Sequence, residues 1–388
     1  MSDSSDQQRR CHMVGGGIAG LAAAVFLLRD AGVPGECIHI HEGRGVPGGS
    51  LDGSGDADAG YLTRGGRMFE RHFACTFDLL STIPTLEDPE QSVTDQIMAF
   101  NRRVPGSSNC RLVRNGEPAE DRDRLTLSAH AIVDLNRLIL SGESGLDGRR
   151  IDDWFQSDFF ESNFWIMWST MFSFQPWHSL TEMRRYLKRF IHLFPGFTRI
   201  AGVLRTPLNQ YDSLIEPIRV WLLGQGVQVH VDSPIVDLDI AAAGDGRMVR
   251  ALRCQDGTEI GVREDDRVFV TLGSMTDASR VGGNTSMVPG RDAAGPAWAL
   301  WRTLAARESG FGRPEVFCGD TASTAWHSFT VTLDGPDFFE FMEDFTNNRT
   351  GTGGLLTIAD SSWFLSIVLF HQPHFRDQKH GTYVFWGY

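Results

Sequence analysis

The hydrophobic pattern near the N-terminus predicts a strand, a helix and a second strand. A short apolar run ends at Val14, and a glycine-rich turn follows it. Residues 18–30 are rich in Ala and Leu, have the length of a helix, and lead into a second apolar run at residues 37–41. This order predicts a βαβ unit, in which a helix connects two parallel strands.

Three further patterns divide the rest of the chain. Residues 47–66 are rich in Gly and Asp, which predicts an extended loop held close to a ligand. Residues 125–197 have a helical pattern and are unusually aromatic, which predicts a second domain. From residue 225 the stretches VQVHV, PIVDLDI and RVFVTLG predict a return to strands, with Asp256 and Gly257 in a hairpin turn. Residues 289–354 give mixed signals and are left unassigned.

The composition is that of a globular chain that does not bind nucleic acid. Of the 388 residues, 41% are hydrophobic and 22% are charged, which allows two domains with separate cores. The net charge of -13 argues against a phosphate-backbone ligand, which requires clustered Lys and Arg. The chain does contain one local cluster of basic residues. Two interpretations stay open for it: a binding site for a carboxylate, or a solvated face of a helix. Its members are Arg184, Arg185, Lys188 and Arg189.

The cysteines and the apolar runs indicate a reducing compartment. The six cysteines are scattered without a CxxC pair, so we expect neither a metal site nor a disulfide framework. The chain starts with polar residues, and its longest apolar run, residues 18–28, is too short to cross a bilayer. We therefore expect a cytoplasmic protein, a monomer or a homodimer, with peripheral membrane contact for substrate uptake left open.

A glycine motif lies between the first strand and the first helix. Gly15, Gly17 and Gly20 form GxGxxG, whose glycines permit a tight turn, close approach of a pyrophosphate and close helix packing. Glu42 follows the second strand, where a carboxylate can accept both hydroxyls of a ribose and would repel a 2′-phosphate. Alone, the motif also fits a glycine-rich turn that binds no ligand.

The continuation of the motif favours FAD over NAD. Glu42, Arg44, Gly48 and Gly49 form E-x-R-x-x-x-G-G, which resembles the extended fingerprint of the glutathione-reductase and amine-oxidase flavoproteins. We expect Val231, just after a later strand, to lie behind the adenine.

The predicted fold class is α/β, with a Rossmann-like FAD-binding domain of the glutathione-reductase/amine-oxidase type and a second, largely helical α+β substrate domain. We expect residues 1–85 and 205–285 to form the FAD domain, completed by residues 355–388. Residues 86–204 and 286–354 are expected to form the substrate domain.

Stretches along nearly the whole chain resemble the oleate hydratase family, also called the myosin-cross-reactive antigens. They are GGSLDGSG from Gly48, RGGRMFE from Arg64, FSFQPWHSLTEMRRYLKRF from Phe172, NQYDSLIEPI from Asn209, VTLGSMTD from Val270 and SSWFLSIVLFHQPHF from Ser361. The resemblance implies addition of water to the cis-9 double bond of oleate and related unsaturated fatty acids, which gives 10-hydroxy acids. It also implies that FAD organises the site and exchanges no electrons with the substrate.

The resemblance assigns roles to residues of these stretches. Tyr186, in EMRRY, matches the family's proposed proton donor, although a tyrosine there also suits an ordinary helix surface. We expect Arg184 and Arg185 to lower the pKa of its phenol. The aromatic run nearby lines an acyl tunnel or forms ordinary core. Further cofactor residues by this resemblance are Ser50, Gly65, Gly66 and Ser274. The expected substrate residues are Trp177, His178, Asn209, Gln210, Tyr211 and His371.

The chain departs from the family at two places. Most members carry a glutamate, thought to polarise the attacking water, at the position of Met68, and a thioether cannot take a proton. RGGRM in place of RGGRE indicates a variant subgroup or an inactive member, with Glu70, His72 or backbone carbonyls as substitutes and Arg67 as an orienting residue. The second departure is the end, VFWGY, which a further long stretch usually follows, so we expect the sequence to be C-terminally truncated.

Two other functions stay open. The fingerprint does not distinguish a redox flavin from a structural one, so a flavin oxidoreductase of the amine-oxidase or desaturase type is the first alternative. Met68 and the abrupt end of the sequence favour the second alternative, a non-catalytic flavoprotein that binds fatty acids.

Overall fold

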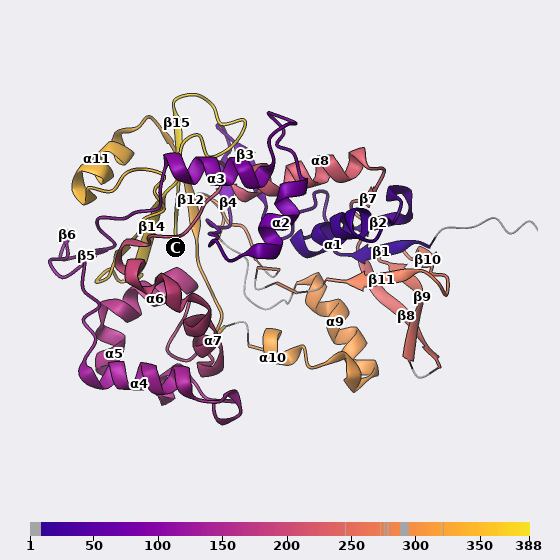
Figure 1. The fold of residues 1–388 in the computed structure, drawn as a ribbon, viewed down its shortest axis with the longest axis horizontal. Helices are drawn as coiled ribbons and strands as arrows, with labels where there is room; N and C mark the ends of the chain where they lie inside the picture. The colour runs from indigo at the N-terminus through magenta and orange to yellow at the C-terminus, as the bar shows by residue number, and fades with distance from the viewer. Residues whose placement is uncertain are drawn as a thin grey trace, which may run out of the picture. The chain divides into compact units, whose positions relative to one another are not determined.

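The computed structural model describes residues 9–388 except 245, 272, 275, 278, 288–294 and 321. The chain divides into two units of mixed α/β structure (Figure 1). Unit 1 comprises Met1–Asp52, Cys75–Thr94 and Gln210–Ala325. Unit 2 comprises Gly53–Ala74, Asp95–Asn209 and Trp326–Tyr388. The functional domain boundaries expected from the sequence stay a prediction.

A parallel sheet lies at the centre of unit 1, with the strand order β11-β1-β2-β7. β1 (Cys11–Val14) pairs in parallel with β2 (Ile38–His41), which confirms the predicted βαβ unit. β2 pairs with β7 (Gln228–His230), and β1 pairs with β11 (Arg267–Val270), so both strands expected in VQVHV and RVFVTLG are present.

The helix of the βαβ unit packs an apolar face on the unit 1 core. α1 (Ile18–Arg29) fully buries Leu21, Ala24 and Val25, and β1 fully buries Met13. Burial of a side chain as large as valine, leucine or methionine stabilises the fold by about 1.5–3 kcal/mol. The other helices in this part of the chain are α2 (Ala74–Thr82), α8 (Glu216–Gly224), α9 (Pro296–Arg307) and α10 (Glu315–Cys318).

One face of the parallel sheet carries four histidines, His12, His39, His41 and His230. Neighbouring rings stack with centroids 5.0–5.5 Å apart. His12 Nδ1 lies 3.2 Å from His41 Nε2, and His39 Nδ1 lies 3.2 Å from His230 Nε2. Burial, together with the neighbouring imidazoles, lowers the pKa of His12 to about 4 and that of His41 to about 3. All four belong to the strands beside the glycine motif.

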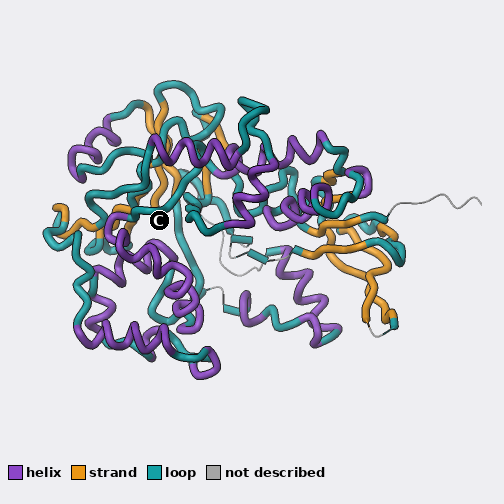
Figure 2. The backbone as a smooth tube through the Cα atoms, viewed as in Figure 1, coloured by secondary structure: helices purple, strands orange, loops and turns teal. Residues whose placement is uncertain are grey.

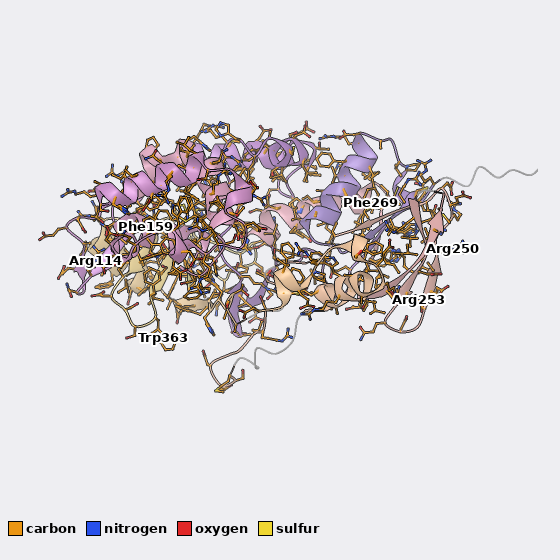
Figure 3. All side chains as sticks on the ribbon, turned by 90° about the horizontal axis from the view of Figure 1, so that it is seen from below. Arg114, Phe159, Arg250, Arg253, Phe269 and Trp363 are labelled. Carbon is orange, nitrogen blue, oxygen red and sulfur yellow. The ribbon has the colours of Figure 1, made fainter. Side chains whose placement is uncertain are left out.

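A second, antiparallel sheet of unit 1 follows β7. It consists of β8 (Ile235–Ala243), β9 (Gly246–Cys254) and β10 (Glu259–Gly261), and Arg250 and Arg253 lie on β9 (Figure 3). The hairpin expected at Asp256-Gly257 joins β9 to β10, with the Cys254 N–H donating to Thr258 O at 2.8 Å. Gly257 has a φ of +87°, which favours glycine.

A mixed sheet in unit 2 has the order β12-β15-β14-β13-β5-β6. Its pairs are antiparallel except β13 with β5. Trp363 is 89% exposed in the segment between β13 and β14 (Figure 3). The strands are β5 (Leu112–Arg114), β6 (Glu117–Pro118), β12 (Phe329–Asp334), β13 (Leu355–Ile358), β14 (Leu365–Leu369) and β15 (Thr382–Gly387). α11 (Asp337–Thr346) follows β12, so the segment left unassigned holds regular structure.

The glycine-rich stretch 47–66, expected as one loop, contains a hairpin. β3 (Gly53–Asp56) pairs with β4 (Gly60–Thr63). The Tyr61 N–H on β4 donates to Thr332 Oγ1 on β12 at 2.9 Å, so a tertiary hydrogen bond holds the hairpin, whose first strand, GSGD, has weak strand propensity.

The aromatic stretch forms helices, as predicted (Figure 2). Ser128, Ser162 and Ser179 cap three of these helices through side chains that accept a backbone N–H. Phe159 and Trp168 lie in the core that these helices share. The helices of unit 2 here are α3 (Val93–Arg103), α4 (Ala129–Leu140), α5 (Ser157–Glu161), α6 (Asn163–Phe172) and α7 (Leu180–Phe190), and a 3₁₀ segment, Ile191–Arg199, follows α7. Among the helices that the structure describes, none has the length and hydropathy to cross a membrane.

Candidate functional site

The two glycine motifs of unit 1 touch one another. The Gly48 N–H donates to Gly16 O at 2.9 Å, and Gly17 and Gly48 form an isolated parallel bridge. Gly48 and Gly49 have φ values of +130° and +59°, and a Cβ on Gly49 would lie 3.2 Å from Gly17 Cα. Glycine is therefore required here by both conformation and space.

Glu42 joins these motifs through its carboxylate. Oε2 accepts the Gly16 N–H and Oε1 accepts the Arg44 N–H, each at 2.9 Å, and the residue is buried. A carboxylate offers about four lone-pair positions, so acceptor capacity remains for two ribose hydroxyls. The backbone N–H groups of Gly16 and Arg44 thus fix the orientation of the Glu42 carboxylate.

The N-terminus of α1 suits an anion. Its N-cap is Gly17, which provides no side-chain cap, and its first turn carries no acidic residue. The first N–H groups of a helix lack intrahelical acceptors and attract phosphate. A Cβ on Gly17 would meet only Gly49 Cα, at 3.8 Å, among the described atoms, so the space in front of this residue is not taken up by protein. These features fit the pyrophosphate and ribose of a dinucleotide.

The other expected cofactor residues divide between the units. Val231, directly after β7, is 42% exposed, and Ser274 Oγ lies 2.9 Å from Thr276 Oγ1. Ser50 belongs to unit 1, whereas Gly65 and Gly66 belong to unit 2. Leu272 and Met275 of VTLGSMTD lie outside the described residues.

Tyr211 was expected at the substrate but borders the nucleotide motif. Its ring lies 3.6 Å from the position of a Cβ on Gly48, and its hydroxyl donates to Glu216 Oε2 at 3.2 Å. Burial and the Glu216 carboxylate raise the pKa of Tyr211 to about 12. Gln210, beside it, is buried in the same unit.

In unit 2 the RGGRM segment is held by backbone and by apolar packing. Phe69 and Leu204 exchange two backbone hydrogen bonds of 2.8 Å. The Met68 side chain packs against the cluster that contains Ile200, Val203 and Trp386. The structure therefore gives Met68 an apolar packing contact, at the position where the resemblance implies a glutamate in most members. Arg67 Nη1 donates to Arg64 O at 3.4 Å.

Glu70 is a buried carboxylate with several donors. Oε2 accepts the His72 N–H at 2.8 Å, lies 2.7 Å from His72 Nδ1 and lies 3.3 Å from His192 Nε2, while Oε1 accepts Arg189. Although burial raises the pKa of Glu70, the hydrogen bonds from His72 and Arg189 outweigh it and lower the pKa to about 2. A carboxylate of such low basicity is poorly suited to take a proton from water.

The same carboxylate forms a cluster that a metal ion could bridge. Ligand atoms of Glu70, His72 and His192 lie within 4.8 Å of one another. The ion pair from Arg189 already neutralises the carboxylate, which disfavours a cation there. The contacts therefore favour a structural role for Glu70, which connects the RGGRM segment to α7 through Arg189 and to the following 3₁₀ segment through His192.

Tyr186 is half-buried among aromatic side chains. Phe172 and Phe174 each meet its ring edge to face at 5.2 Å. Burial, followed by the Glu182 carboxylate, raises the pKa of Tyr186. The expected acidification by Arg184 and Arg185 is therefore wrong: both guanidiniums pair with Glu143, at 3.4 and 2.6 Å, and their charge is compensated there.

A small apolar cavity of about 20 Å³, partly open to solvent, shares two wall residues with the surroundings of Tyr186. Phe172 and Phe190 line it and also contact the Tyr186 ring, at centroid distances of 5.2 and 5.9 Å. The remaining lining residues are Trp168, Met171, Leu193, Phe194, Gly196, Phe197, Ile200, Ala201 and Val203. Part of the aromatic stretch thus lines a cavity, and part of it forms core.

The other expected substrate residues lie in different surroundings. Trp177 is 44% exposed, and His178 Nδ1 accepts the Gln175 N–H at 3.3 Å. Asn209 is buried, and its side-chain amide donates to His374 O at 3.1 Å. His371 meets Phe100 edge to face at 5.0 Å.

Sequence reasoning missed two residues beside His371. Arg103 and Arg205 lie over the ring of Phe100, at 6.0 and 5.9 Å from its centroid. No signal in the sequence marks Arg205 as buried, because arginine is usually exposed.

Comparison with known proteins identifies the family. The MCRA family model matches residues 8–388. The chain is 38% identical over 391 residues to an oleate hydratase of Streptococcus pyogenes, covering 98% of this chain and 66% of that protein. It is 30% identical over 414 residues to a linoleate hydratase of Lactiplantibacillus plantarum, covering 97% and 72%. It thus spans about two thirds of the length of these relatives.

A crystal structure of a Pyrococcus furiosus protein resembles the chain in fold alone. The TM-score is 0.53 at 12% identity, over 97% of this chain and 79% of that chain. The sequence matches carry more weight than this likeness of fold. They cover nearly the whole chain, and the identity to the oleate hydratase is 38%. The chain belongs to the MCRA family.

Proposed function

We propose that this protein is an FAD-dependent hydro-lyase that adds water to the cis-9 double bond of oleate and related unsaturated fatty acids, giving 10-hydroxy acids. The relatives named oleate hydratase and linoleate hydratase support this class of reaction. The observation that carries the proposal is the position of Tyr186, whose ring contacts two walls of the apolar cavity.

The aromatic walls of the cavity supply an apolar surface against which part of an acyl chain can lie. Each CH₂ transferred from water to apolar surroundings contributes about 0.8 kcal/mol, so a chain that lies along these aromatic walls binds without any polar contact.

Tyr186 acts as the proton donor. Its phenol transfers a proton to C9, the π electrons form the new C–H bond, and water attacks the positive charge at C10. The water then loses a proton, which restores the phenol, so the net change is the addition of one water. The raised pKa of Tyr186 leaves the phenol protonated at neutral pH but makes it a weaker acid than a free tyrosine.

The residue that orients the water differs from the usual family glutamate. Met68 offers no base, and the low pKa of Glu70 makes its carboxylate a weak one. When water attacks a carbocation, the water must be oriented, but it does not need a strong base. The backbone carbonyls of the RGGRM segment can accept hydrogen bonds from this water and so orient it. Arg67 is the orienting side chain in this proposal.

FAD would bind to unit 1 and organise the reaction site without exchanging electrons with the substrate. Gly15, Gly17 and Gly20 would approach the pyrophosphate, and Glu42 would accept the ribose hydroxyls. Ser50, Val231 and Ser274 complete the cofactor residues that we propose in unit 1, and for Gly65 and Gly66 the proposal depends on the resemblance to the family alone.

Product analysis in ¹⁸O-labelled water tests the reaction. We expect a 10-hydroxy acid that carries one ¹⁸O from water, with no consumption of oxidant or reductant. Product oxygen that derives from O₂, or bleaching of the flavin by substrate, would favour a flavin oxidoreductase. Binding of oleate with no hydroxylated product would favour the non-catalytic flavoprotein.

A further inference from the structure

Two of the four stacked histidines of unit 1 are accessible to solvent. His230 is exposed on β7, the last strand in the order of the parallel sheet, and His39 on the neighbouring β2 is half-buried. His12 stacks on His39 and His41 stacks on His230, with ring centroids 5.1 and 5.0 Å apart, and both of these inner rings are buried. The outer pair, His39 and His230, is therefore the one that a solute can reach.

The outer pair brings two imidazole nitrogens together. His39 Nδ1 lies 3.2 Å from His230 Nε2. Zinc binds imidazole nitrogen at about 2.0–2.1 Å, so two nitrogens that share a tetrahedral zinc ion are about 3.3 Å apart. The separation of the two nitrogens in the sheet therefore matches that of two ligands of one ion, and a small rotation of each ring would direct both lone pairs at it.

The sheet holds both imidazoles of the outer pair in place. β2 and β7 pair in parallel with His39 opposite Gln228 and His41 opposite His230, so His39 and His230 are diagonal neighbours on adjacent strands. The stacked rings of His12 and His41 restrict the side chains further. Ligands that the fold positions in advance lose little conformational freedom when an ion binds, which favours binding.

The charged side chains near the outer pair compensate one another. Arg10 and Asp266 act electrostatically on His39. Arg10 and Arg263 both pair with Asp266, at 3.2 and 2.9 Å, and Arg263 also lies 3.7 Å from Asp265. Two cations and two anions thus form one group without net charge. The imidazoles, and not this group, therefore decide which ion binds.

Two neutral imidazoles select one class of ion. Imidazole suits Zn²⁺, Cu²⁺ and Ni²⁺, whereas Mg²⁺ and Ca²⁺ prefer oxygen ligands. A neutral imidazole carries one proton and coordinates through its other nitrogen, so His39 would keep its proton on Nε2 and His230 on Nδ1. The shared hydrogen bond is then replaced by two metal–nitrogen bonds without loss of a proton, and water fills the remaining positions of the ion.

We propose that His39 and His230 form a binding site for a divalent transition-metal ion of the zinc type on the parallel sheet of unit 1. The site does not depend on the proposed function. It lies beside the nucleotide motif, because the His230 carbonyl accepts the Glu42 N–H at 2.9 Å. An ion that connects β2 to β7 therefore stabilises the backbone next to Glu42.

Calorimetric titration of the purified full chain with ZnCl₂ at pH 7.5 tests the site. We expect a dissociation constant of about 1–100 μM, roughly half the binding free energy of a four-ligand zinc site. His230→Gln and His39→Gln should each weaken binding at least about tenfold. MgCl₂ should give no binding at the pair. The matched control is His72→Gln, which removes an imidazole of the Glu70 cluster in unit 2 and should leave the affinity unchanged.

Zinc should also raise the melting temperature of the wild-type protein and of His72→Gln, but not that of His230→Gln, because an ion that binds only the folded state stabilises it. Loss of zinc binding in His72→Gln with full binding in His230→Gln would assign the ion to the Glu70 cluster and overturn the proposal. Equal affinities of the wild-type protein, His39→Gln and His230→Gln would show adventitious zinc only and would overturn it too. If His39→Gln does not fold, the exposed variant His230→Gln decides.

Discussion

Arg189, three residues after Tyr186 on α7, donates a hydrogen bond to the buried carboxylate of Glu70, two residues after Met68. This ion pair connects the helix of the proposed proton donor to the RGGRM segment. The position of Tyr186 relative to the RGGRM segment therefore depends on side chains that need not touch the substrate.

Glu70→Gln should weaken this connection. A carboxamide accepts fewer of the hydrogen bonds that reach the buried carboxylate, so we expect the free energy of unfolding to fall by about 1–3 kcal/mol. Urea denaturation measures the change, and a double-mutant cycle with Arg189→Gln isolates the pair. Arg185→Gln, which breaks an exposed pair with Glu143, is the control and should have little effect. Additive effects of Glu70→Gln and Arg189→Gln would contradict the coupling.

The lowered pKa of Glu70 also predicts a pH dependence. A carboxyl whose pKa falls from 4.5 to about 2 on folding stabilises the protein fully above pH 4.5, and this contribution is lost as the pH falls toward 2. Wild-type stability should decrease over this range more steeply than that of Glu70→Gln. Parallel pH profiles of the two proteins in denaturant titrations would show that Glu70 has an ordinary pKa.

The histidines of unit 1 predict acid sensitivity at a higher pH. The folded pKa values of His12 and His41, about 4 and 3, lie below the ordinary value of 6.5, so protons bind the unfolded chain more tightly. Stability is therefore complete above pH 6.5 and falls as the pH drops toward 4. Arg10 strengthens and Asp266 weakens the shift of His12.

Melting temperatures at pH 7.5 and 5 measure this effect. His12→Gln with His41→Gln should reduce the difference between the two pH values, whereas His130→Gln, an exposed histidine of α4, should not. A wild-type melting temperature that is equal at both pH values would contradict the neutral histidine stack.

Gly17→Ala should separate flavin binding from folding. Gly17 has a φ of -70°, and a Cβ there meets only Gly49 Cα at 3.8 Å among the described atoms, so the fold accommodates the methyl group. The methyl group would stand where the pyrophosphate approaches the helix. We expect an unchanged melting temperature of the apoprotein and a loss of the flavin absorbance band after purification.

Gly20→Ala provides the contrast, because its Cβ would lie 2.1 Å from Gly15 O and must disturb the fold itself. Stoichiometric flavin in a folded Gly17→Ala protein would refute the assignment of this motif to the cofactor.

Tyr186→Phe should remove turnover and keep binding. The phenylalanine ring preserves the contacts with Phe172 and Phe174, while the loss of the acid should slow hydration of oleate by about 10² or more. Tyr383→Phe, a change of another half-buried tyrosine of unit 2, is the control for removing a hydroxyl. Wild-type turnover by Tyr186→Phe would place the proton donor elsewhere.

Local patterns in the sequence were sufficient for the βαβ unit, the β9–β10 hairpin and the helices of the aromatic stretch. Each depends on interactions between residues close in the chain: the period of apolar positions, the serine caps and the glycines that adopt positive φ. The contact between the E-x-R-x-x-x-G-G motif and GxGxxG is a finding of the structure.

Tertiary structure alone decided the electrostatics of the candidate sites. The sequence places Arg184 and Arg185 beside Tyr186, yet both turn to Glu143, and burial then raises the pKa of Tyr186. Likewise, Arg103, Arg205 and His371 come from three distant segments and meet only around Phe100. A pKa or an unpaired buried charge depends on solvent exclusion and on distances between remote side chains, and local sequence contains neither quantity.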